Sequence, residues 1–452
     1  MPIGKPVGEE KRPCKWIDLQ FTDLIGKFYH VTLSVPSYAK PDEIVGKVDG
    51  SSIKGFALIE ESDLFLKPDP STWAKLPWFD DLERYICNVF DENTRLERDP
   101  RYVLEKTVHV MADAGYSVLM GVELEFFVFK TIRLRGGDSG FGLGYFIQGI
   151  DEGRYTLPQK HGYCSQLPVD NLMEFRQNLC NILSSYFGIK VISHHHEVAS
   201  NGQIELSLKE DSPVNLADKI QTTKYAAKVE AHKNNLTASF LPKPLYGDNG
   251  SGMHVHVSLW RKNRNVFDDP DDEYAHLSQE ARYFIGGLLE HSRAISAIIA
   301  PTTNSYRRLV PGYEAPVYLV WGKANRSAAI RVPISGSSSS RRIEYRPPDP
   351  SSNPYLALAA ILMAGLDGIK KKIDSGDPLN VNACTYPKRH QLKTLPRTLW
   401  EALDELESDN NFLKPVFSDD LLETYINLKR REAEKVYSHP HPAEFREYID
   451  LL

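Results

Sequence analysis

The sequence predicts an α+β protein, and three observations indicate this fold class. The chain has 452 residues, of which 41% are hydrophobic and 25% charged, so it can bury a sizeable core in two or three domains. Residues 15 to about 100 hold short apolar runs broken by turn signals, which is typical of a small mixed sheet with few helices. From about residue 102 onward, strand-like runs alternate with long amphipathic segments.

In the N-terminal part, strands are expected at three runs, KWIDLQFTD, KFYHVTLSV and RYICNVFDE. A domain boundary is expected at Asp99-Pro-Arg101, because Pro100 disfavours helix at the residue before it. Beyond this boundary, the spacing of apolar residues predicts helices over residues 171–187, 215–234, 277–299, 355–373, 399–407 and 419–437. The longest apolar stretch, residues 355–366, is too short to span a bilayer and is expected as a buried helix.

Composition and charge exclude several function classes. The net charge is −6 with acidic and basic residues interspersed, and no basic tail or stripe suggests nucleic acid, so small-molecule partners are expected. The five cysteines are scattered without a CxxC pair, which is typical of reduced thiols in a cytoplasmic protein. The N-terminus lacks the apolar core of a secretory signal, and no membrane association is expected.

Polar residues recur at alternate positions of the strands expected in the large domain. Glu123 and Glu125 lie two apart in Gly121-Val-Glu-Leu-Glu-Phe-Phe127, and residues i and i+2 of a strand share one face. The same spacing recurs in four further segments, namely Gln203/Glu205/Ser207, His254/His256/Ser258, Arg342/Glu344/Arg346 and His195/Glu197.

One strand of this kind has an ordinary explanation, an antiparallel strand whose polar face meets water. Four or five strands rich in Glu, His and Arg, with almost no Thr, fit that explanation poorly. Facing one another, these strands would form a pocket that holds Glu123, Glu125, Glu197, Glu205, Glu344 and His254. Several carboxylates in one cavity repel each other, shift their pKa upward or bind cations, and cations are the simplest answer.

The chemistry of the expected ligands indicates which cations the site would bind. Carboxylate-dominated sites suit Mg²⁺ or Mn²⁺, and the set is large enough for two octahedral ions that keep some waters. The run His194-His-His-Glu197 could suggest zinc, but the sequence has no HExxH motif. Two metals beside several arginines indicate phosphoryl transfer, because ions and guanidinium groups neutralise phosphate oxygens. Those arginines are Arg308, Arg326, Arg331, Arg342 and Arg346.

Two loops complete the candidate site. Residues Gly247–Met253 are rich in glycine, so they predict either a plain hairpin turn or a backbone that approaches a ligand. In Pro311–Pro316, Glu314 is flanked by helix breakers, and it is either a solvated residue or, near the arginines, a lid carboxylate. The sequence contains no Walker A motif and no kinase-like GxGxxG before a helix.

Taken together, these segments resemble glutamine synthetase of the bacterial and archaeal type I. The matching stretches include VDGSSIKGF at 48–56, GVELEFFVF at 121–129, HHHEVA at 194–199, KPLYGDNGSGMHVHVSL at 243–259, TTNSYRRLVPGYEAP at 302–316, NRSAAIRVP at 325–333 and RRIEYRPPDPSSNPYLALAAILMAGLDGI at 341–369. The resemblance implies an N-terminal β-grasp domain over residues 1–104. It also implies a catalytic domain over residues 105–452, built on a split antiparallel β-barrel surrounded by helices.

The resemblance also implies a role for each candidate residue. The ligands of the metal at the glutamate end would be Glu125, Glu197 and Glu205, and those of the nucleotide metal Glu123, His254 and Glu344. Glutamate would be held by Arg308, Arg346, Asn249 and Gly250, and ammonium by Asp49, Ser52, Tyr163 and Glu197. ATP would contact His256, Ser258, Arg331 and Arg342, with His195 near the transferred phosphate. The catalytic roles would fall to Arg326 on the phosphoryl group, Asp49 as the base and Glu314 as the lid.

The implied activity is that of a glutamate–ammonia ligase. ATP phosphorylates the side-chain carboxylate of glutamate, and ammonia then displaces phosphate from γ-glutamyl phosphate to give glutamine. The implied cofactors are Mg²⁺ or Mn²⁺, two or three ions per site, with ATP as co-substrate. The implied assembly is a dodecamer of two stacked hexamers with each active site at a subunit boundary, and a small regulatory protein is a further expected partner.

The chain departs from the family pattern at several positions. Cys384 stands where the regulated subclass carries its adenylylated Tyr, and Tyr386 lies nearby, so no control by adenylylation is expected. Leu58 stands where part of the alpha-like subclass has an Arg tied to glutamine feedback, which leaves feedback control open. Further departures lie near the expected nucleotide and amine, at Ile192, Ser339 and residues 161–166.

Three alternative functions remain open on the sequence. A γ-glutamyl-amine ligase that uses methylamine, ethanolamine or a polyamine would keep the fold, but intact Asp49, Ser52 and Glu314 favour ammonia. A catalytically silent structural or regulatory protein would have no need of the complete set of metal ligands and arginines. A zinc hydrolase would ignore ATP and lose activity to zinc-selective chelators.

Overall fold

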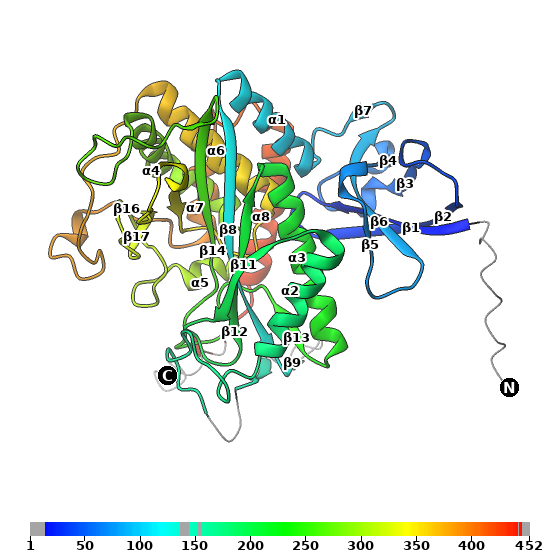
Figure 1. Ribbon diagram of the computed structural model, residues 1–452, viewed down its shortest axis with the longest axis horizontal. Coiled ribbons are helices and arrows are strands. Elements are labelled where there is room, and N and C mark those ends of the chain that lie inside the picture. The colour runs from blue at the N-terminus through cyan, green and yellow to red at the C-terminus, as the bar shows by residue number, and fades with distance from the viewer. Residues whose placement is uncertain (1–13, 136–143, 152–155, 442, 445–452) are drawn as a thin grey trace. The chain divides into compact units, whose positions relative to one another are not determined.

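The computed structural model describes residues 14–135, 144–151, 156–441 and 443–444. The chain divides into two compact units, Met1–Tyr102 and Val103–Leu452. Sheets and helices alternate along the C-terminal unit, whereas the N-terminal unit holds strands and short 3₁₀ turns (Figure 1). The expected α+β class is therefore confirmed.

The N-terminal unit is built on one mixed sheet of seven strands. These are β1 Cys14–Thr22, β2 Phe28–Pro36, β3 Gly46–Asp49, β4 Asp63–Pro68, β5 Ala74–Lys75, β6 Leu82–Asp91 and β7 Thr94–Arg95. The order is β2-β1-β6-β4-β3, in which β1 lies parallel to β6 and the other neighbours are antiparallel; β5 and β7 also pair with β6. The three runs expected as strands in this part form β1, β2 and β6.

Alternation along these strands decides where the core of the N-terminal unit lies. Ile17, Leu19 and Phe21 of β1 occupy every second position and so share one face of the strand, while the polar residues between them are also buried. They belong to one apolar cluster with Leu64 and Leu66 of β4. The unit therefore has a hydrophobic core of its own, which is the mark of a domain.

The C-terminal unit is built on a nine-stranded, mostly antiparallel sheet that curves into a nearly closed, barrel-like wall. Its strands are β8 Ser117–Phe129, β11 Val191–His196, β12 Gln203–Asp211, β13 Thr237–Ser239, β14 Met253–Arg261, β15 Arg264–Asn265, β16 Tyr318–Lys323, β17 Ala328–Val332 and β18 Ile343–Tyr345. The order is β11-β12-β8-β14-β18-β17-β16, with β13 beside β8 and β15 beside β14. A separate hairpin pairs β9 Thr131–Arg135 with β10 Gly144–Gln148.

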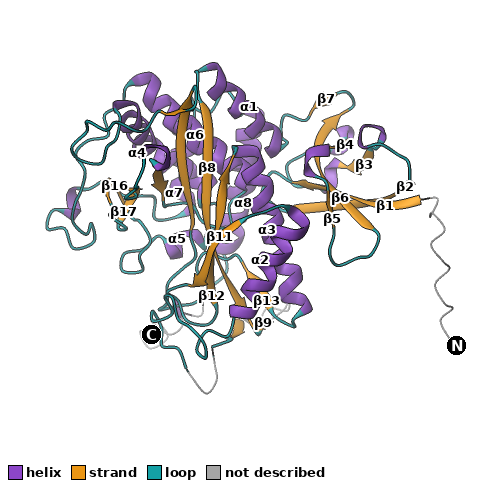
Figure 2. Cartoon of the chain, in the orientation of Figure 1, coloured by secondary structure: helices purple, strands orange, loops and turns teal. Residues whose placement is uncertain are grey.

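The long strand β8 shows how the two faces of this sheet differ. Val122, Leu124 and Phe126 are almost fully buried on one face. Glu123 and Glu125 occupy the alternate positions, and Glu125 is only 6% exposed. Helix α3, Pro213–Lys233, contacts β8 and β12 (Figure 2). A strand with apolar residues on one face and two carboxylates, one buried and one half-buried, on the other therefore lines a polar interior.

The α-helices in the described part of the chain agree closely with the sequence periodicity. They are α1 Pro100–Asp113, α2 Met173–Phe187, α3, α4 Gln279–Ile299, α5 Ser305–Arg308, α6 Pro354–Lys371, α7 Leu399–Ser408 and α8 Asp419–Tyr437. The six expected helices appear as α2, α3, α4, α6, α7 and α8, each end within two residues of its expected position. Helix α1 was not expected. Pro100 is its first residue, where a missing N–H leaves no helical hydrogen bond unmade.

Helices α4 and α6 pack closely because two glycines face each other. A Cβ atom added at Gly287 would lie 2.6 Å from the Cα of Gly368, and one added at Gly368 would lie 2.2 Å from the carbonyl oxygen of Tyr283. Residues 355–366 are all buried within α6, which confirms the expected buried helix. Among the described residues, no helix is long and apolar enough to cross a membrane.

Candidate active site

The register of the large sheet places acidic and imidazole side chains beside one another. Ser207 of β12 and His254 of β14 both lie opposite Glu123 of β8, and Glu205 lies opposite Glu125. Directly opposed residues on antiparallel strands have Cβ atoms about 4.5–5.5 Å apart. One face of three neighbouring strands therefore carries these five side chains.

The same face continues onto the outer strands of the sheet. His195 of β11 lies opposite Glu205. On the other side, His256 of β14 lies opposite Glu344 of β18, which lies opposite Arg331 of β17. Pairing between strands, and not closeness in sequence, assembles this set of residues.

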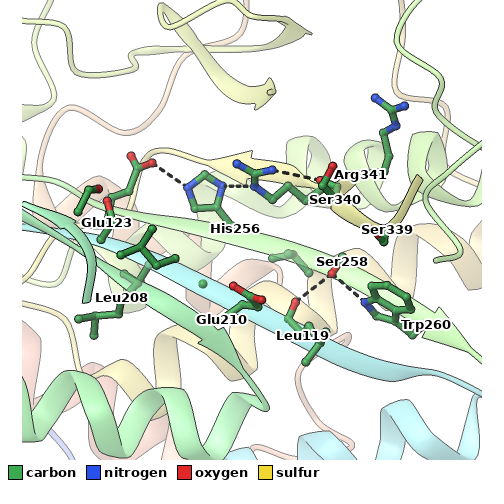
Figure 3. A pocket seen from close by; sticks show the side chains of 17 residues that line it. Leu119, Glu123, Leu208, Glu210, His256, Ser258, Trp260, Ser339, Ser340 and Arg341 are labelled. Atoms are coloured by element: carbon green, nitrogen blue, oxygen red, sulfur yellow. Dashed lines mark hydrogen bonds and ion pairs between the residues drawn. The ribbon is translucent and has the colours of Figure 1, made fainter. Parts of the chain in front are cut away.

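Two cavities open on this face, and Glu123 lines both. The carboxylate cavity has a volume of about 680 Å³, and its lining includes Glu123, Glu125, Tyr163, Glu197, Glu205, Asn249, Gly250, His254, Arg308, Glu314, Arg326, Arg346 and Cys384. The serine–arginine cavity has a volume of about 620 Å³, and its lining includes Glu123, Ile192, Ser207, Glu210, His256, Ser258, Trp260, Ser339, Ser340, Arg341 and Arg342 (Figure 3). Both cavities lie within the C-terminal unit.

Repulsion between buried carboxylates dominates the carboxylate cavity. Burial and the charges of Glu197 and Glu205 raise the pKa of Glu125 well above its usual range. Burial and the charge of Glu205 raise the pKa of Glu197 to about 7. Backbone N–H groups offset part of this charge, since Gly252 donates to Glu125 Oε2 at 2.8 Å and Val198 donates to Glu197 Oε2 at 2.6 Å. The cavity therefore favours the binding of cations.

Glu123 and Glu344 are instead held as carboxylates by neighbouring histidine and arginine side chains. Burial opposes ionisation of Glu344, but Arg346, His256 and His254 lower its pKa to about 2. Burial also opposes ionisation of Glu123, and its hydrogen bonds with His254 and His256 prevail, so its pKa is lowered. Its Oε2 lies 3.3 Å from His254 Nδ1. Its Oε1 lies 3.0 Å from His256 Nε2 (Figure 3).

Two groups of side chains among the described residues have donor atoms close enough to share a metal ion. In each group the donor atoms lie within 4.8 Å of one another, and the groups are Glu123/Glu205/His254 and His195/Glu197/Glu205. Burial and the charge of Arg346 lower the pKa of His254, which favours the neutral imidazole that binds metals. Because carboxylates predominate, the donor set fits hard divalent ions such as Mg²⁺ or Mn²⁺.

These two groups do not coincide with the two ligand sets that the resemblance implies. Glu205 belongs to both groups, and His195 joins one of them, with its Nε2 3.3 Å from Glu205 Oε1. Glu344 forms ion pairs with Arg331 and Arg346. The expected residues thus meet in one place, although the two groups defined by donor distances differ from the expected sets.

Residues expected to hold glutamate and the phosphoryl group line the carboxylate cavity. Arg308 is buried and donates to the carbonyl oxygens of Pro347 at 2.8 Å and Arg346 at 3.1 Å. Asn249, Gly250, Arg326 and Arg346 line the same cavity. Tyr163 also lines it, with its ring 5.3 Å from that of His195 in an edge-to-face contact.

The loop Pro311–Pro316 contributes Glu314 to the wall of the carboxylate cavity. Glu314 has a φ of +60°, a left-handed conformation that costs a residue other than glycine roughly 1–2 kcal/mol. Its Oε2 accepts a hydrogen bond from Asn249 Nδ2 at 3.2 Å. Such a conformation persists only where the surrounding contacts enforce it.

The serine–arginine cavity gathers most of the residues expected to contact ATP. Arg342 Nε lies 3.3 Å from His256 Nδ1, and the indole N–H of Trp260 donates to Ser258 Oγ at 3.0 Å (Figure 3). Trp260 and Glu210 were not expected in the site. Trp260 follows Ser258 by two residues in one strand, so the two-residue period could have found it.

The side chain of Gln203 connects several residues in and around the carboxylate cavity, although no role was expected for it from the sequence. Its side-chain nitrogen donates to Glu125 Oε2 at 3.4 Å, to the Gly250 carbonyl oxygen at 3.0 Å and to Ser251 Oγ at 3.2 Å. The position of Gln203 two residues before Glu205 was the only sequence signal for this contact. It links strand β12 to the glycine-rich loop that precedes β14.

Asp49 and Ser52 lie in the N-terminal unit, at the turn that follows β3. Asp49 Oδ1 accepts hydrogen bonds from the Ser51 N–H at 2.9 Å and the Ser51 hydroxyl at 2.7 Å, and Oδ2 accepts one from Ser52 Oγ at 2.7 Å. These bonds from Ser52 and Ser51 lower the pKa of Asp49. Leu58 is exposed in the same unit.

The comparisons with known proteins agree along nearly the whole chain. The family described as glutamine synthetase, beta-Grasp domain, matches residues 13–92, and the family described as glutamine synthetase, catalytic domain, matches residues 97–448. A glutamine synthetase from Sulfolobus acidocaldarius is 50% identical over 452 residues, with 96% of each chain covered. One from Escherichia coli is 43% identical over 462 residues, with 97% of each chain covered.

Solved structures show the same similarity. The cryo-EM structure of Plasmodium falciparum glutamine synthetase superposes with a TM-score of 0.87 at 29% identity, covering 98% of this chain and 97% of the other. A structure described as a GmaS/ADP complex superposes with a TM-score of 0.84 at 27% identity, covering 97% of each chain.

Proposed function

This chain belongs to the glutamine synthetase family, and we propose that the two adjoining cavities of its C-terminal unit carry out the family's reaction. The protein is an ATP-dependent glutamate–ammonia ligase, whose substrates are glutamate, ammonia and ATP. The observation that supports our residue assignment is the strand register, which brings Glu123, Glu205 and His254 to one face of the sheet.

The reaction needs two steps because a carboxylate has no adequate leaving group for ammonia. Transfer of the γ-phosphoryl group of ATP to the glutamate side chain releases ADP and gives γ-glutamyl phosphate. The ammonia nitrogen then attacks the acyl carbon, the carbon–oxygen bond to phosphate breaks, and phosphate leaves. A base must take one proton from ammonium before this attack.

The divalent ions that the family uses would be held by two sets of residues. Glu125, Glu197 and Glu205 would hold one at the glutamate end, and Glu123, His254 and Glu344 would hold one at the nucleotide end. Bound there, the ions would neutralise phosphate oxygens and keep the crowded carboxylates ionised. The predominance of oxygen donors supports Mg²⁺ or Mn²⁺.

The arginines would orient the two substrates. Arg308 and Arg346 would hold the glutamate carboxylate in the carboxylate cavity, helped by Asn249 and the backbone of Gly250. Arg326 would stabilise the phosphoryl group in transfer, with His195 close by. Contacts to ATP would come from His256, Ser258, Arg331 and Arg342, and the ADP in the GmaS complex supports a nucleotide site in this fold.

Deprotonation and closure would complete the site. The hydroxyl groups of Ser51 and Ser52 keep Asp49 ionised, as a base for ammonium must be. Tyr163, Ser52 and Glu197 would complete the ammonium pocket. Glu314 would close the carboxylate cavity and so keep water from the acyl phosphate.

The role of Asp49 can be tested by separating the two steps. Asp49→Asn should lower glutamine formation about a hundredfold or more, because a positioned base contributes about 10²–10⁴-fold. ADP formation from ATP and glutamate without ammonium should persist, because Asp49 acts only in the second step. ADP would be measured by chromatography in a reaction without ammonium, and ADP and glutamine together in a reaction with ammonium.

The matched control is Asp63→Asn, because Asp63 is an exposed carboxylate directly opposite Asp49 in the strand pair. It should leave both steps unchanged. An equal loss of ADP and glutamine in Asp49→Asn would show that Asp49 serves binding or folding and is not the base.

The alkylamine alternative is disfavoured, because the relatives at 43–50% identity are glutamine synthetases. A panel of amines with ADP detection would measure the preference directly, and ammonium should be the best substrate. We also propose that the chain assembles as stacked hexamers, with sites shared between subunits. Five unpaired cysteines fit a reducing compartment such as the cytoplasm.

A further inference from the structure

Two lysines from separate loops lie against one aromatic ring that lines the carboxylate cavity. The Nζ atom of Lys160 lies 4.2 Å from the centroid of the Tyr313 ring, and that of Lys243 lies 3.7 Å from it. Ammonium groups this close to a ring face are attracted by its quadrupole. Tyr313 belongs to the loop Pro311–Pro316 and directly precedes Glu314.

Asp248 forms hydrogen bonds with both lysines and so positions them near the same ring. Its buried carboxylate accepts a hydrogen bond from the Lys160 N–H at 3.1 Å, and its carbonyl oxygen accepts one from Lys243 Nζ. The same carboxylate accepts bonds from Ser200 N at 2.8 Å and Asn249 N at 3.0 Å. One residue therefore fixes both cations relative to the wall of the cavity.

Further contacts fix the lysines and the loop independently of the ring. Lys160 Nζ also donates to the Gly312 carbonyl oxygen at 3.4 Å. The backbone of Lys243 is held by Asn304, which accepts from its N–H at 2.7 Å and donates to its carbonyl oxygen at 3.0 Å. Lys243 is thus anchored independently of the loop Pro311–Pro316.

We propose that Lys160 and Lys243 clamp the ring of Tyr313 and thereby hold Glu314 over the carboxylate cavity. The clamp is a positioning device, since neither lysine lines the cavity. It supplies a reason why Glu314 keeps its left-handed backbone, because the preceding residue is fixed by two cations. This inference rests on the proposed role of Glu314 as the lid.

The clamp has a measurable consequence for the reaction. A cation–π contact of this kind shifts the balance between closed and open loop by about two- to thirtyfold. An open loop admits water, and water attacks γ-glutamyl phosphate to give glutamate and phosphate. A weakened clamp therefore raises the amount of ADP formed for each glutamine.

The test uses the full-length protein in its native assembly and measures ADP and glutamine in the same reaction. Tyr313→Leu and Lys160→Met should each raise the ratio of ADP to glutamine about twofold or more. Tyr313→Phe and Lys160→Arg keep a ring and a cation, so they should retain the wild-type ratio. Lys27→Met is the matched control, since Lys27 lies 4.4 Å from the Tyr29 ring in the N-terminal unit.

A second measurement separates the clamp from the lid. Hydrogen exchange of a peptide that covers residues 311–316 should be faster in Tyr313→Leu and Lys160→Met, and unchanged in Lys27→Met. Unchanged exchange in folded variants would overturn the clamp, whatever the product ratio. If Glu314→Ala leaves the ratio at the wild-type value, the lid fails, and faster exchange in the other variants would still support the clamp.

Discussion

Without a bound ion, burial and mutual repulsion oppose ionisation of Glu125 and Glu197 in the carboxylate cavity. Burial and mutual repulsion raise the pKa of Glu197 to about 7 and raise that of Glu125 well above its usual range. The ordinary pKa of Glu197 is 4.5, so between pH 4.5 and 7 and without a bound ion Glu197 binds more protons in the folded protein than in the unfolded chain. The contribution of Glu197 to stability therefore falls as the pH rises through this window.

Metal removal should accordingly destabilise the protein more at pH 8 than at pH 6. A bound divalent ion favours the ionised carboxylates, so the stability gap between ion-loaded and ion-free protein should widen with pH by on the order of 1–3 kcal/mol. Thermal unfolding with Mg²⁺ and with a chelator, at both pH values, measures the gap. Glu197→Gln should narrow the difference, and a gap independent of pH would contradict the repulsion.

At the scale of elements, the contact between α4 and α6 depends on the absence of two side chains. Gly287 and Gly368 bring the helix backbones within contact distance, and the atoms that a Cβ would meet belong largely to the backbone. Backbone atoms cannot move aside as the end of a flexible side chain can. The glycines therefore fix how closely the buried helix α6 packs against α4.

Gly287→Ala or Gly368→Ala should lower the free energy of unfolding by about 1–3 kcal/mol. Alanine gains about 1 kcal/mol in helix propensity over glycine, and the clash with backbone should outweigh that gain. Chemical denaturation measures the change. Gly336→Ala is the control, because a Cβ there meets nothing within 4 Å and should leave stability unchanged. Stable Gly287→Ala protein would show that the helices can separate without loss.

Strand β14 shows how one element can supply functional side chains through the alternation of its residues. Strand β14 holds His254, His256 and Ser258 on one face and buries Val255 and Val257 on the other. The apolar face secures the strand in the sheet, and the polar face lines both cavities. Packing and function therefore occupy alternate residues of one strand and do not compete.

At the scale of the whole molecule, the proposed residues are divided between two compact units. Asp49 and Ser52 belong to Met1–Tyr102, and the residues of both cavities belong to Val103–Leu452. If sites are shared between subunits, as we propose, two differently inactivated chains can complement each other. The division of the residues thus makes the assembly testable by activity.

Asp49→Ala and Glu205→Gln chains should each be inactive alone and active when co-assembled. In a random equal mixture, about a quarter of shared sites combine an intact Asp49 with an intact Glu205. Activity near a quarter of wild type is therefore expected after joint refolding or co-expression. Mixed assemblies without activity would place Asp49 and Glu205 of one site in the same subunit. Separately folded chains that are mixed without exchange provide the baseline.

Local patterns in the sequence were sufficient for much of the fold and for the identity of the candidate residues. The period of apolar residues located six helices within two residues at each end, because helix formation and amphipathicity are local properties. It missed the four-residue helix α5 and also α1, in which Pro100 was read as a boundary and also opens the helix. The roles given to individual residues stay predictions until the variants are measured.

The sequence by itself determined the family, the alternating strands and the presence of carboxylates, imidazoles and guanidinium groups at every second position. These features follow from residue type and spacing along the chain, and they do not depend on which strands pair. Only the tertiary structure decided that Glu123 lies between Ser207 and His254, that Gly287 meets Gly368 and that two lysines share the ring of Tyr313. The reason is physical: register and loop contacts are set by the packing of the whole sheet, which joins residues far apart in the chain.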